Sequence, residues 1–336
     1  GTLDSTCTIT IGPNTVSKLW FIENATSGSQ SIIISQGSGA SITILNGQTK
    51  AIYSDGAGSG AAMVDAFTDL SVPSISTSTA GTSNVRIGDG AGASIASGGN
   101  TNTLVGDSAG AAISTGDSNV AVGYQALQTE DGHGQNVAIG YRALKTLDAG
   151  ADALNVAVGM QAGTSVTTGV RQTLIGAQAG DALTTGDNNT AVGYNSLSAM
   201  TVGDRNVAVG VGTLAAANVT TNADTYNTAV GFDAGNDITT GIRNTLIGGL
   251  AGDAITSGDN NIAIGYAAMT ANTLGDRNVA IGNEALEAFN ITTTTDSYNV
   301  AVGFQAGHTL TTGVDNTLIG GLAGDAITDA DFNVAV

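Results

Sequence analysis

A short apolar pattern recurs along most of the chain. From residue 84 onward each copy reads Asn, then Val, Thr or Ile, then mostly Ala or Leu, then Val or Ile, then Gly. β-Branched residues bounded by Asn and Gly predict a short strand that ends in a turn. Fourteen copies are complete and a fifteenth begins at Asn333, with closing glycines at Gly88, Gly106, Gly123, Gly140, Gly159, Gly176, Gly193, Gly210, Gly231, Gly248, Gly265, Gly282, Gly303 and Gly320.

The spacing of these glycines predicts the fold class. Most are 17 residues apart, whereas helix-pair repeats need about 33 to 47 residues. Val120 and Val122 lie on one face of such a strand and Ala121 on the other, so both faces are apolar and we expect both to be buried, as in parallel sheets. The sequence predicts an all-β protein with a parallel β-solenoid of about 14 coils, stacked about 4.8 Å apart into a rod of roughly 65–70 Å.

A longer rhythm lies over the 17-residue period. Four positions after the glycine, pairs of Gly alternate with pairs of Leu or Met, as at Gly163 and Gly180 followed by Leu197 and Leu214. Spacings of 17, 17, 17 and 21 sum to 72 residues. Leucine replaces alanine in the strand once in each unit, at Leu104, Leu174, Leu246 and Leu318. The larger unit is therefore four coils long.

The asparagines of the pattern predict a structural ladder, in which each amide satisfies its own turn and bonds the neighbours above and below. Gln172 is the one substitution in this file, whose other members are Asn119, Asn136, Asn155, Asn189, Asn206, Asn227, Asn244, Asn261, Asn278, Asn299 and Asn316. A second turn is marked by glycines at which we expect a positive φ, namely Gly169, Gly186, Gly203, Gly241, Gly258, Gly275 and Gly313.

A file of small residues leads to a prediction about assembly. Three positions after the glycine stands Ala, as at Ala126, Ala162 and Ala234, with Ser196 and Thr213 as the exceptions. This file suggests close approach of another backbone or another chain, and we interpret it as an outward face of the coil. A thin coil with few large side chains buries little apolar surface by itself, so we expect three copies to pack side by side as a homotrimer.

Residues 1–80 lack the period and predict a small all-β domain. Alternating stretches at 6–11 and 31–35 are typical of strands, and Gly-rich turns at 37–39 and 55–56 separate them. The Ser/Thr-rich stretch 71–83 is interpreted as a neck. The predicted organisation is a small β-domain with its neck over 1–80, followed by the repeat shaft over 81–336, which stops within a repeat.

Composition and charge exclude several functions. The 336 residues include 49 Gly, 2 Pro and 1 Cys, and the net charge is −19. One cysteine excludes a disulfide scaffold and a multi-cysteine metal site. The acidic balance argues against nucleic-acid binding, which needs clustered Lys and Arg. No apolar run reaches the roughly 18 residues of a membrane span, so no membrane insertion is expected.

Candidate chemistry is sparse, and we predict no catalytic residues, no cofactor and no metal ligands. His133 and His308 lie 175 residues apart and are interpreted as surface turn residues. The glycine-rich strings at 56–60 and 88–92 lack the βαβ context of a phosphate-binding loop. Aspartates beside glycine leave bound calcium open as the minor alternative to a solvated, ion-paired turn, at Asp117, Asp187, Asp204, Asp259 and Asp276.

Two further features concern the surface. A file of hydroxyl residues includes Thr167, Thr184 and Thr256, and because Ala usually stands two positions earlier, stacked turn threonines are favoured over a flat ice-binding face. Insertions of four residues occur once per four coils and form possible surface-contact bulges. Glycan contact and tolerated loop growth are both open for these bulges, which contain Asn218, Thr220, Thr221, Asn290, Thr292 and Thr293.

A resemblance to known families rests on three segments. Residues 21–28 (FIENATSG) and 53–56 (YSDG) resemble small β-domains of bacteriophage tail fibre proteins. Residues 189–194 (NTAVGY) resemble repeats of the same fibres and are also similar to head repeats of trimeric autotransporter adhesins. The resemblance implies a virion protein, the shaft of a homotrimeric tail fibre that contributes to attachment to a host-surface glycan or protein, with a receptor-binding tip following the shaft.

Two other functions remain open. One is a bacterial adhesin on the cell surface, whose coils themselves bind glycans or matrix. The other is an endoglycosidase on a β-helix, which needs paired carboxylates in one groove. Because no such pairing follows from the spacing, we expect a protein that is not an enzyme.

Overall fold

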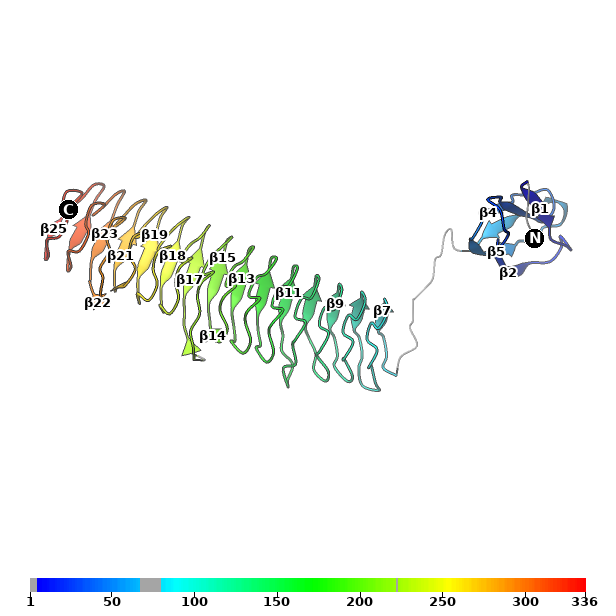
Figure 1. Cartoon of the computed structure of the whole chain (residues 1–336), viewed down its shortest axis with the longest axis horizontal. Coiled ribbons are helices and arrows are strands. Elements are labelled where there is room, and N and C mark those ends of the chain that lie inside the picture. Colours follow the sequence, from blue (N-terminus) through cyan, green and yellow to red (C-terminus); the bar gives the residue numbers. More distant parts are fainter. Residues whose placement is uncertain (1–4, 67–79, 222) are drawn as a thin grey trace. The chain divides into compact units, whose positions relative to one another are not determined.

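The regular secondary structure of the described residues consists of short β-strands and one 3-10 turn (Figure 1). The structure is a computed structural model that describes residues 5–66, 80–221 and 223–336. Two compact units divide the chain, Gly1–Ile75 and Ser76–Val336. The predicted neck at 71–83 lies outside the described residues up to position 79.

The N-terminal unit holds two three-stranded sheets and one 3-10 turn, η1 (Gly58–Gly60). In the order β1-β3-β4, β1 pairs in parallel with β3 and β3 pairs antiparallel with β4. The other sheet, β2-β5-β6, is antiparallel. The strands are β1 (Cys7–Thr10), β2 (Lys18–Glu23), β3 (Ile32–Ser35), β4 (Ile42–Ile44), β5 (Thr49–Ser54) and β6 (Met63–Asp65).

Large apolar side chains from both sheets form the core of this unit. Ile32, Ile34 and Ile44 come from the first sheet, and Ile52 and Met63 come from the second. All five are buried. Contact between the two sheets through one shared core agrees with the predicted small all-β domain.

The second unit is a parallel β-solenoid, as the 17-residue period predicts. One three-residue strand per coil joins a 15-stranded parallel sheet, shortened to two residues in the last coil. Successive copies of the pattern pair in register, so Ala121 lies opposite Ala138. The strands are β7 (Val85–Ile87), β8 (Thr103–Val105), β9 (Val120–Val122), β10 (Val137–Ile139), β11 (Val156–Val158), β12 (Thr173–Ile175), β13 (Thr190–Val192), β15 (Val207–Val209), β17 (Thr228–Val230), β18 (Thr245–Ile247), β19 (Ile262–Ile264), β21 (Val279–Ile281), β23 (Val300–Val302), β24 (Thr317–Ile319) and β25 (Val334–Ala335).

A short strand in each insertion pairs with a short strand of the preceding coil, which forms two additional ladders. β14 (Gly203–Asp204) pairs in parallel with β16 (Ala223–Asp224). β20 (Gly275–Asp276) pairs in the same way with β22 (Thr295–Asp296). The two ladders are 72 residues apart in the sequence and so repeat the four-coil unit.

The four-coil unit reflects complementary packing inside the solenoid. Leu174 of β12 lies over two glycines, because a Cβ on Gly163 would come within 2.6 Å of its Cδ1 and one on Gly180 within 2.8 Å of its Cδ2. In two alanine coils of each unit, Leu or Met stands at the turn position instead, as at Leu197 and Leu214, whereas Ala157 shares its coil with Gly163. A large side chain at the strand position is thus paired with glycine at the turn, and large turn side chains are paired with alanine in the strand. The interior stays filled while the coil spacing remains constant.

The asparagine file lies inside the solenoid and is hydrogen-bonded from coil to coil. The Asn119 carbonyl accepts the backbone N–H of Asn136 at 3.0 Å, and the Asn155 amide donates to the Gly169 carbonyl at 2.9 Å. Gln172 accepts from the Asn189 backbone at 3.2 Å and continues the file. Each of these side chains is at most 1% exposed, so their bonds are shielded from water.

The glycines of the second turn differ from the expectation. Gly169, Gly186 and Gly241 do not have a positive φ. Glycine is required there because the coils stack closely, and a Cβ on Gly169 would approach the Gly186 carbonyl oxygen to 2.6 Å. Positive φ belongs instead to the glycines that end the strands, such as Gly123 with φ 131°.

Candidate functional site: an exposed apolar sheet face

The most extensive uniform surface of the solenoid is the outer face of the 15-stranded sheet. The residues on either side of the central residue of each strand, which are the second and fourth of the repeat pattern, point outward, and all of them are Val, Ile or Thr. None of them is buried: Ile139 is 37% exposed, Ile175 40% and Ile319 42%. We call these two rows the outer sheet face.

This exposure overturns the expectation that both faces of the strands are buried. In the single chain only the middle residue of a strand, such as Ala121 or Leu174, is fully buried, and in the first strand, β7, even this residue is half-buried. The apolar pattern was interpreted as in a doubly covered sheet, but a solenoid coil covers its sheet from the inside only.

The alanine file is also on the opposite side from the one predicted. Ala126, Ala162 and Ala234 have no exposed surface and belong to the solenoid core. They are small because they lie inside a thin coil, next to the turn that ends the strand. The apolar residues that point outward are therefore the β-branched residues of the outer sheet face.

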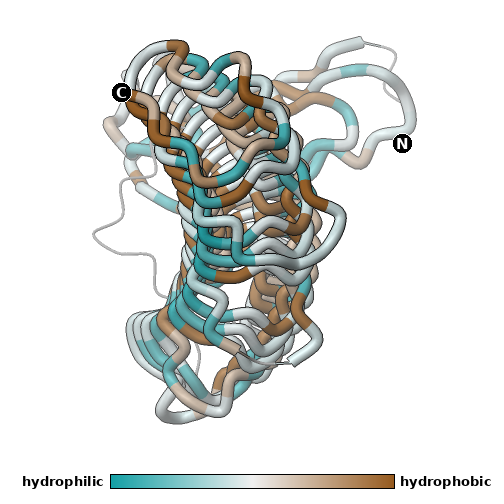
Figure 2. The backbone as a smooth tube through the Cα atoms, turned by 90° about the vertical axis from the view of Figure 1, so that its left-hand side faces the viewer, coloured by the Kyte–Doolittle hydropathy of each residue, from teal (hydrophilic) through white to brown (hydrophobic). Residues whose placement is uncertain are grey.

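At the position after the closing glycine, nine of the 14 complete repeats have Tyr, Phe, Met, Val or Ala. Tyr124, Tyr194, Tyr266 and Phe304 are each between 41% and 55% exposed, and the rings of Tyr124 and Tyr141 stack with centroids 5.5 Å apart. Hydrophobic residues recur at matching places in successive coils when the tube is coloured by hydropathy (Figure 2). Together these residues widen the apolar strip.

The two insertions carry a matching set of polar and aromatic side chains. Arg205 forms an ion pair with Asp224, and its guanidinium lies 5.7 Å from the centre of the Tyr226 ring. The Tyr226 hydroxyl donates to Asp224 at 2.9 Å. The second copy repeats these contacts with Arg277, Asp296 and Tyr298.

The predicted bulge residues have two different positions. Thr220, Thr221, Thr292 and Thr293 are exposed. The other two continue the hydroxyl file, since the Thr201 hydroxyl donates to Asn218 and the Thr273 hydroxyl donates to Asn290, both at 2.8 Å. Residue 222 of the first bulge lies outside the described residues.

The aspartates considered for calcium act as turn caps. The Asp187 carboxylate accepts the Val170 backbone N–H at 2.9 Å, and Asp259 accepts that of Ile242 at 2.8 Å. Among the described residues, neither belongs to a group of three or more candidate metal ligands. The two such groups lie elsewhere and contain Glu130, Asp131, His133 and Asp148, and Glu284, Glu287 and His308.

Both histidines have neighbours that the sequence interpretation as isolated surface residues missed. The His308 Nε2 lies 2.5 Å from a Glu287 carboxylate oxygen, and the His133 Nδ1 lies 3.5 Å from Glu130. Glu130 could have been found from the repeat alignment, because its position is apolar in most other coils.

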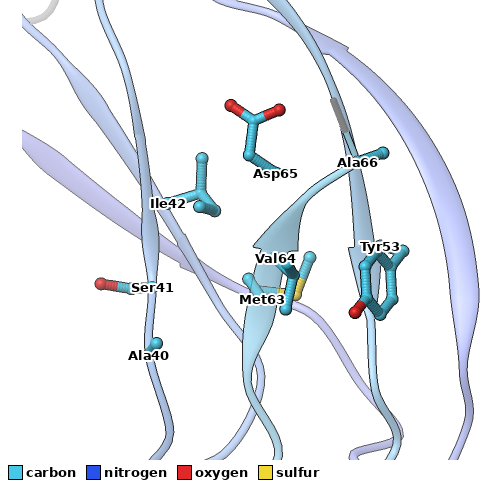
Figure 3. Close-up of a pocket in the computed structure, with 8 residues that line it drawn as sticks. All are labelled: Ala40, Ser41, Ile42, Tyr53, Met63, Val64, Asp65 and Ala66. Atoms are coloured by element: carbon cyan, nitrogen blue, oxygen red, sulfur yellow. The ribbon is translucent and has the colours of Figure 1, made fainter. Parts of the chain in front are cut away.

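The N-terminal unit has a pocket of about 440 Å³ (Figure 3). Its one charged lining residue, Asp65, is paired with Lys50 at 3.2 Å. The rest of the lining is small or apolar apart from Tyr53 and Ser41. These residues are not arranged as a catalytic set, since a nucleophile–base pair is not among them.

Comparison with protein-family models, with curated proteins and with solved structures finds no match. No helix in the described part of the chain is long and apolar enough to cross a membrane.

Proposed function

We propose that this chain is a structural, non-enzymatic fibre protein whose solenoid forms a homotrimeric shaft. In this assembly the outer sheet faces of three copies pack about a common axis. The observation that carries the proposal is the pair of uncharged Val, Ile and Thr rows, which follow all 15 strands and are partly or fully exposed in the single chain.

The size of the outer sheet face supports a second and third copy as its cover. Fifteen strands about 4.8 Å apart, each about 10 Å long, span roughly 700 Å². This area is above the largest patch of a typical monomer, roughly 300–600 Å², and close to the roughly 800 Å² per partner of a stable interface. Parallel copies also have identical coil spacing, so equivalent residues meet at the same height.

Charge supports the same interface. The chain has a net charge of −19, and both rows of the outer sheet face lack charged residues. Association through any acidic surface brings like charges together, whereas association through this face keeps them apart. The charged surfaces then remain in water and limit sticking between fibres.

The resemblance of residues 21–28, 53–56 and 189–194 to tail fibre segments supports a proposal for the location and biological role of this shaft. We propose a virion location and a contribution to host-surface attachment, with a glycan or protein receptor engaged by the fibre as a whole. The shaft's role is mechanical, since backbone and asparagine ladders connect every coil to the next.

A second candidate is a cell-surface adhesin whose coils bind glycans directly. The observation that favours it is the pair of equivalent insertions, in which Tyr226 and Tyr298 are 48% and 50% exposed beside an Arg–Asp pair. Exposed aromatic rings with adjacent polar groups suit sugar binding. Glycan-array binding that is lost in Tyr226→Ala/Tyr298→Ala, with the oligomer intact, would favour this candidate.

Multi-angle light scattering of the full chain in low and high salt tests the assembly. We expect a particle of three times the chain mass of 32.9 kDa, unchanged by salt because the interface is apolar. Ile175→Glu/Ile247→Glu places charges on the outer sheet face and is expected to give monomers. Thr168→Glu/Thr240→Glu adds the same charge at exposed turns and is the matched control.

A wild-type monomer would overturn the proposed shaft assembly. A trimer that persists in Ile175→Glu/Ile247→Glu would place its interface elsewhere. Circular dichroism of both variants verifies that the strands are retained, because the substituted side chains point away from the solenoid core.

A further inference from the structure

One carboxylate occupies a position that other coils reserve for the apolar core. Glu130 stands seven residues after Gly123, and its side chain is 0% exposed. A buried carboxylate is stable only when it is neutralised, paired or bound to a metal. The corresponding residues of the other coils are Ile95, Ile113, Leu147, Val166, Leu183, Met200, Ala217, Ile238, Ile255, Asn272, Phe289, Leu310 and Ile327.

Asn272 is the other polar residue at this position of the coil, and its side chain forms hydrogen bonds within its own turn. Its amide donates to the Gly275 carbonyl at 3.0 Å and its carbonyl oxygen accepts the Gly275 backbone N–H at 2.9 Å. Glu130 is not hydrogen-bonded in this way. Its carboxylate oxygens accept the backbone N–H groups of His133 at 3.2 Å and of Ala149, in the next coil, at 3.5 Å.

Other metal-ligating side chains surround this carboxylate. Asp131 and His133 follow it in the coil of β9, and Asp148 comes from the next coil. One ligand atom from each of the four residues lies within 4.8 Å of all the others. Asp152 holds the loop in place by accepting the Gly134 backbone N–H at 2.9 Å.

A second, independent observation comes from the imidazole. The Nδ1 atom of His133 is buried and has no hydrogen-bond partner among the residues that the structure describes. It lies 3.5 Å from the Glu130 Oε1 but forms no hydrogen bond with it. The His133 side chain is 32% exposed, and a bound ion shared by its buried Nδ1 and the buried carboxylate would satisfy both groups.

We propose a divalent transition-metal site that links two successive coils and whose ligands are Glu130, Asp131, His133 and Asp148. Imidazole nitrogen with carboxylate oxygen is a ligand set that Zn²⁺ accepts in four-coordinate geometry. The ion neutralises the buried carboxylate and binds the free Nδ1. The site stabilises the shaft between β9 and β10 and does not depend on the proposed trimer.

Equilibrium dialysis of the chelator-treated full chain against Zn²⁺, with metal quantified by mass spectrometry, tests the site. The experiment uses a His308→Ala background, because Glu284, Glu287 and His308 form the other candidate group. We expect saturable uptake of about one zinc ion per chain. Zinc is also expected to raise the melting temperature, since it binds the folded state.

Two variants in the same background identify the ligands. Glu130→Leu restores the residue type of the neighbouring coils, so the metal-free protein is expected to melt no lower than its parent while zinc uptake is lost. His133→Asn removes the imidazole from a half-buried position and is expected to weaken zinc binding by about tenfold or more. If Glu130→Leu fails to fold, His133→Asn still tests the site.

Absence of saturable uptake by the His308→Ala protein would overturn the site. Unchanged uptake in both Glu130→Leu and His133→Asn would do the same, because the zinc would then lie elsewhere. The oligomer mass is recorded in each sample, so failure of the proposed trimer is distinguished from failure of the metal site.

Discussion

The two units of this chain bury their interiors in different ways. The N-terminal unit gathers large residues, including Ile34, Ile52 and Met63, from strands that are distant in sequence into one core. In the solenoid each coil contributes a few small or medium residues and pairs with the coils next to it. A compact domain is expected to unfold as one unit, whereas a solenoid depends on the sum of neighbouring contacts. A destabilising substitution should therefore affect the whole of the first unit, but only the neighbouring coils of the second.

Loss of a buried asparagine is expected to have the largest effect on this comparison. In the wild type the Asn189 side chain accepts the Asn206 backbone N–H at 3.0 Å and donates to the Gly203 carbonyl at 2.9 Å. Asn189→Ala leaves both backbone groups without this partner. Two unsatisfied buried groups cost about 2–6 kcal/mol. Hydrogen exchange followed by mass spectrometry should show faster exchange in the coils around residue 189 and unchanged exchange in residues 5–66.

The matched variant is in the N-terminal unit. The buried Asn24 amide donates to the Gln30 and Ile44 carbonyls, both at 3.0 Å. Asn24→Ala should accelerate exchange throughout residues 5–66 and leave the solenoid unaffected. Uniform exchange over all coils in Asn189→Ala would contradict the local behaviour expected of a solenoid.

A cavity in the solenoid core is expected to have the next largest effect. Leu174→Ala removes the side chain that lies over Gly163 and Gly180, and such truncations cost about 2–5 kcal/mol. Adding Gly163→Leu and Gly180→Leu reproduces the arrangement of the coils with Leu127, Ala138 and Leu144. The triple variant should recover most of the lost stability in thermal melting.

Failure of the triple variant to recover would mean that the turn and strand positions are not interchangeable. Gly163 and Gly180 have φ values of 57° and 56°, and Leu127 and Leu144 have 51° and 46°. Because leucine already adopts this conformation at equivalent positions, backbone strain is not expected to prevent recovery. Gly163→Leu and Gly180→Leu without Leu174→Ala should be destabilising through overpacking.

The period of the sequence predicted the solenoid because every coil repeats one local solution. Asn, two outward β-branched residues and Gly are sufficient to fix a strand and its turn, as at Asn119–Gly123. The direction of each residue within the coil was harder to predict. Ala126 and Val122 are both apolar, and only the closure of the coil decides that the first is buried and the second half-exposed.

The candidate sites were less predictable for a related reason. The surrounding groups of Glu130 come from two coils, and the two-residue expansion between Gly140 and Gly159 brings Asp148 beside it. Spacing within one repeat does not reveal such a contact. The anomaly of a glutamate in an apolar file was visible in the sequence, but its ligand-like surroundings depend on how adjacent coils stack.

The smallest expected effect on stability comes from two aspartates in the turns of the solenoid. Asp181 and Asp253 are equivalent residues, 72 positions apart, and each has a buried Oδ1 without a hydrogen-bond partner in the described part of the chain. Burial raises the pKa of both carboxyls above the ordinary value of 3.8. The folded state thus holds its protons more tightly than the unfolded state, so stability falls as pH rises from about 3.8 through the raised pKa. Asp181→Ala/Asp253→Ala removes this loss and should melt higher than the wild type at pH 7, with a difference that shrinks towards pH 3. The gain is modest because both groups are partly exposed and solvent screens their charge.

Asp325→Ala changes the equivalent but exposed residue of the last unit and is expected to leave the melting curves unchanged. A difference between wild type and double variant that stays constant from pH 3 to 7 would show that the side-chain volume, and not the charge, sets the effect.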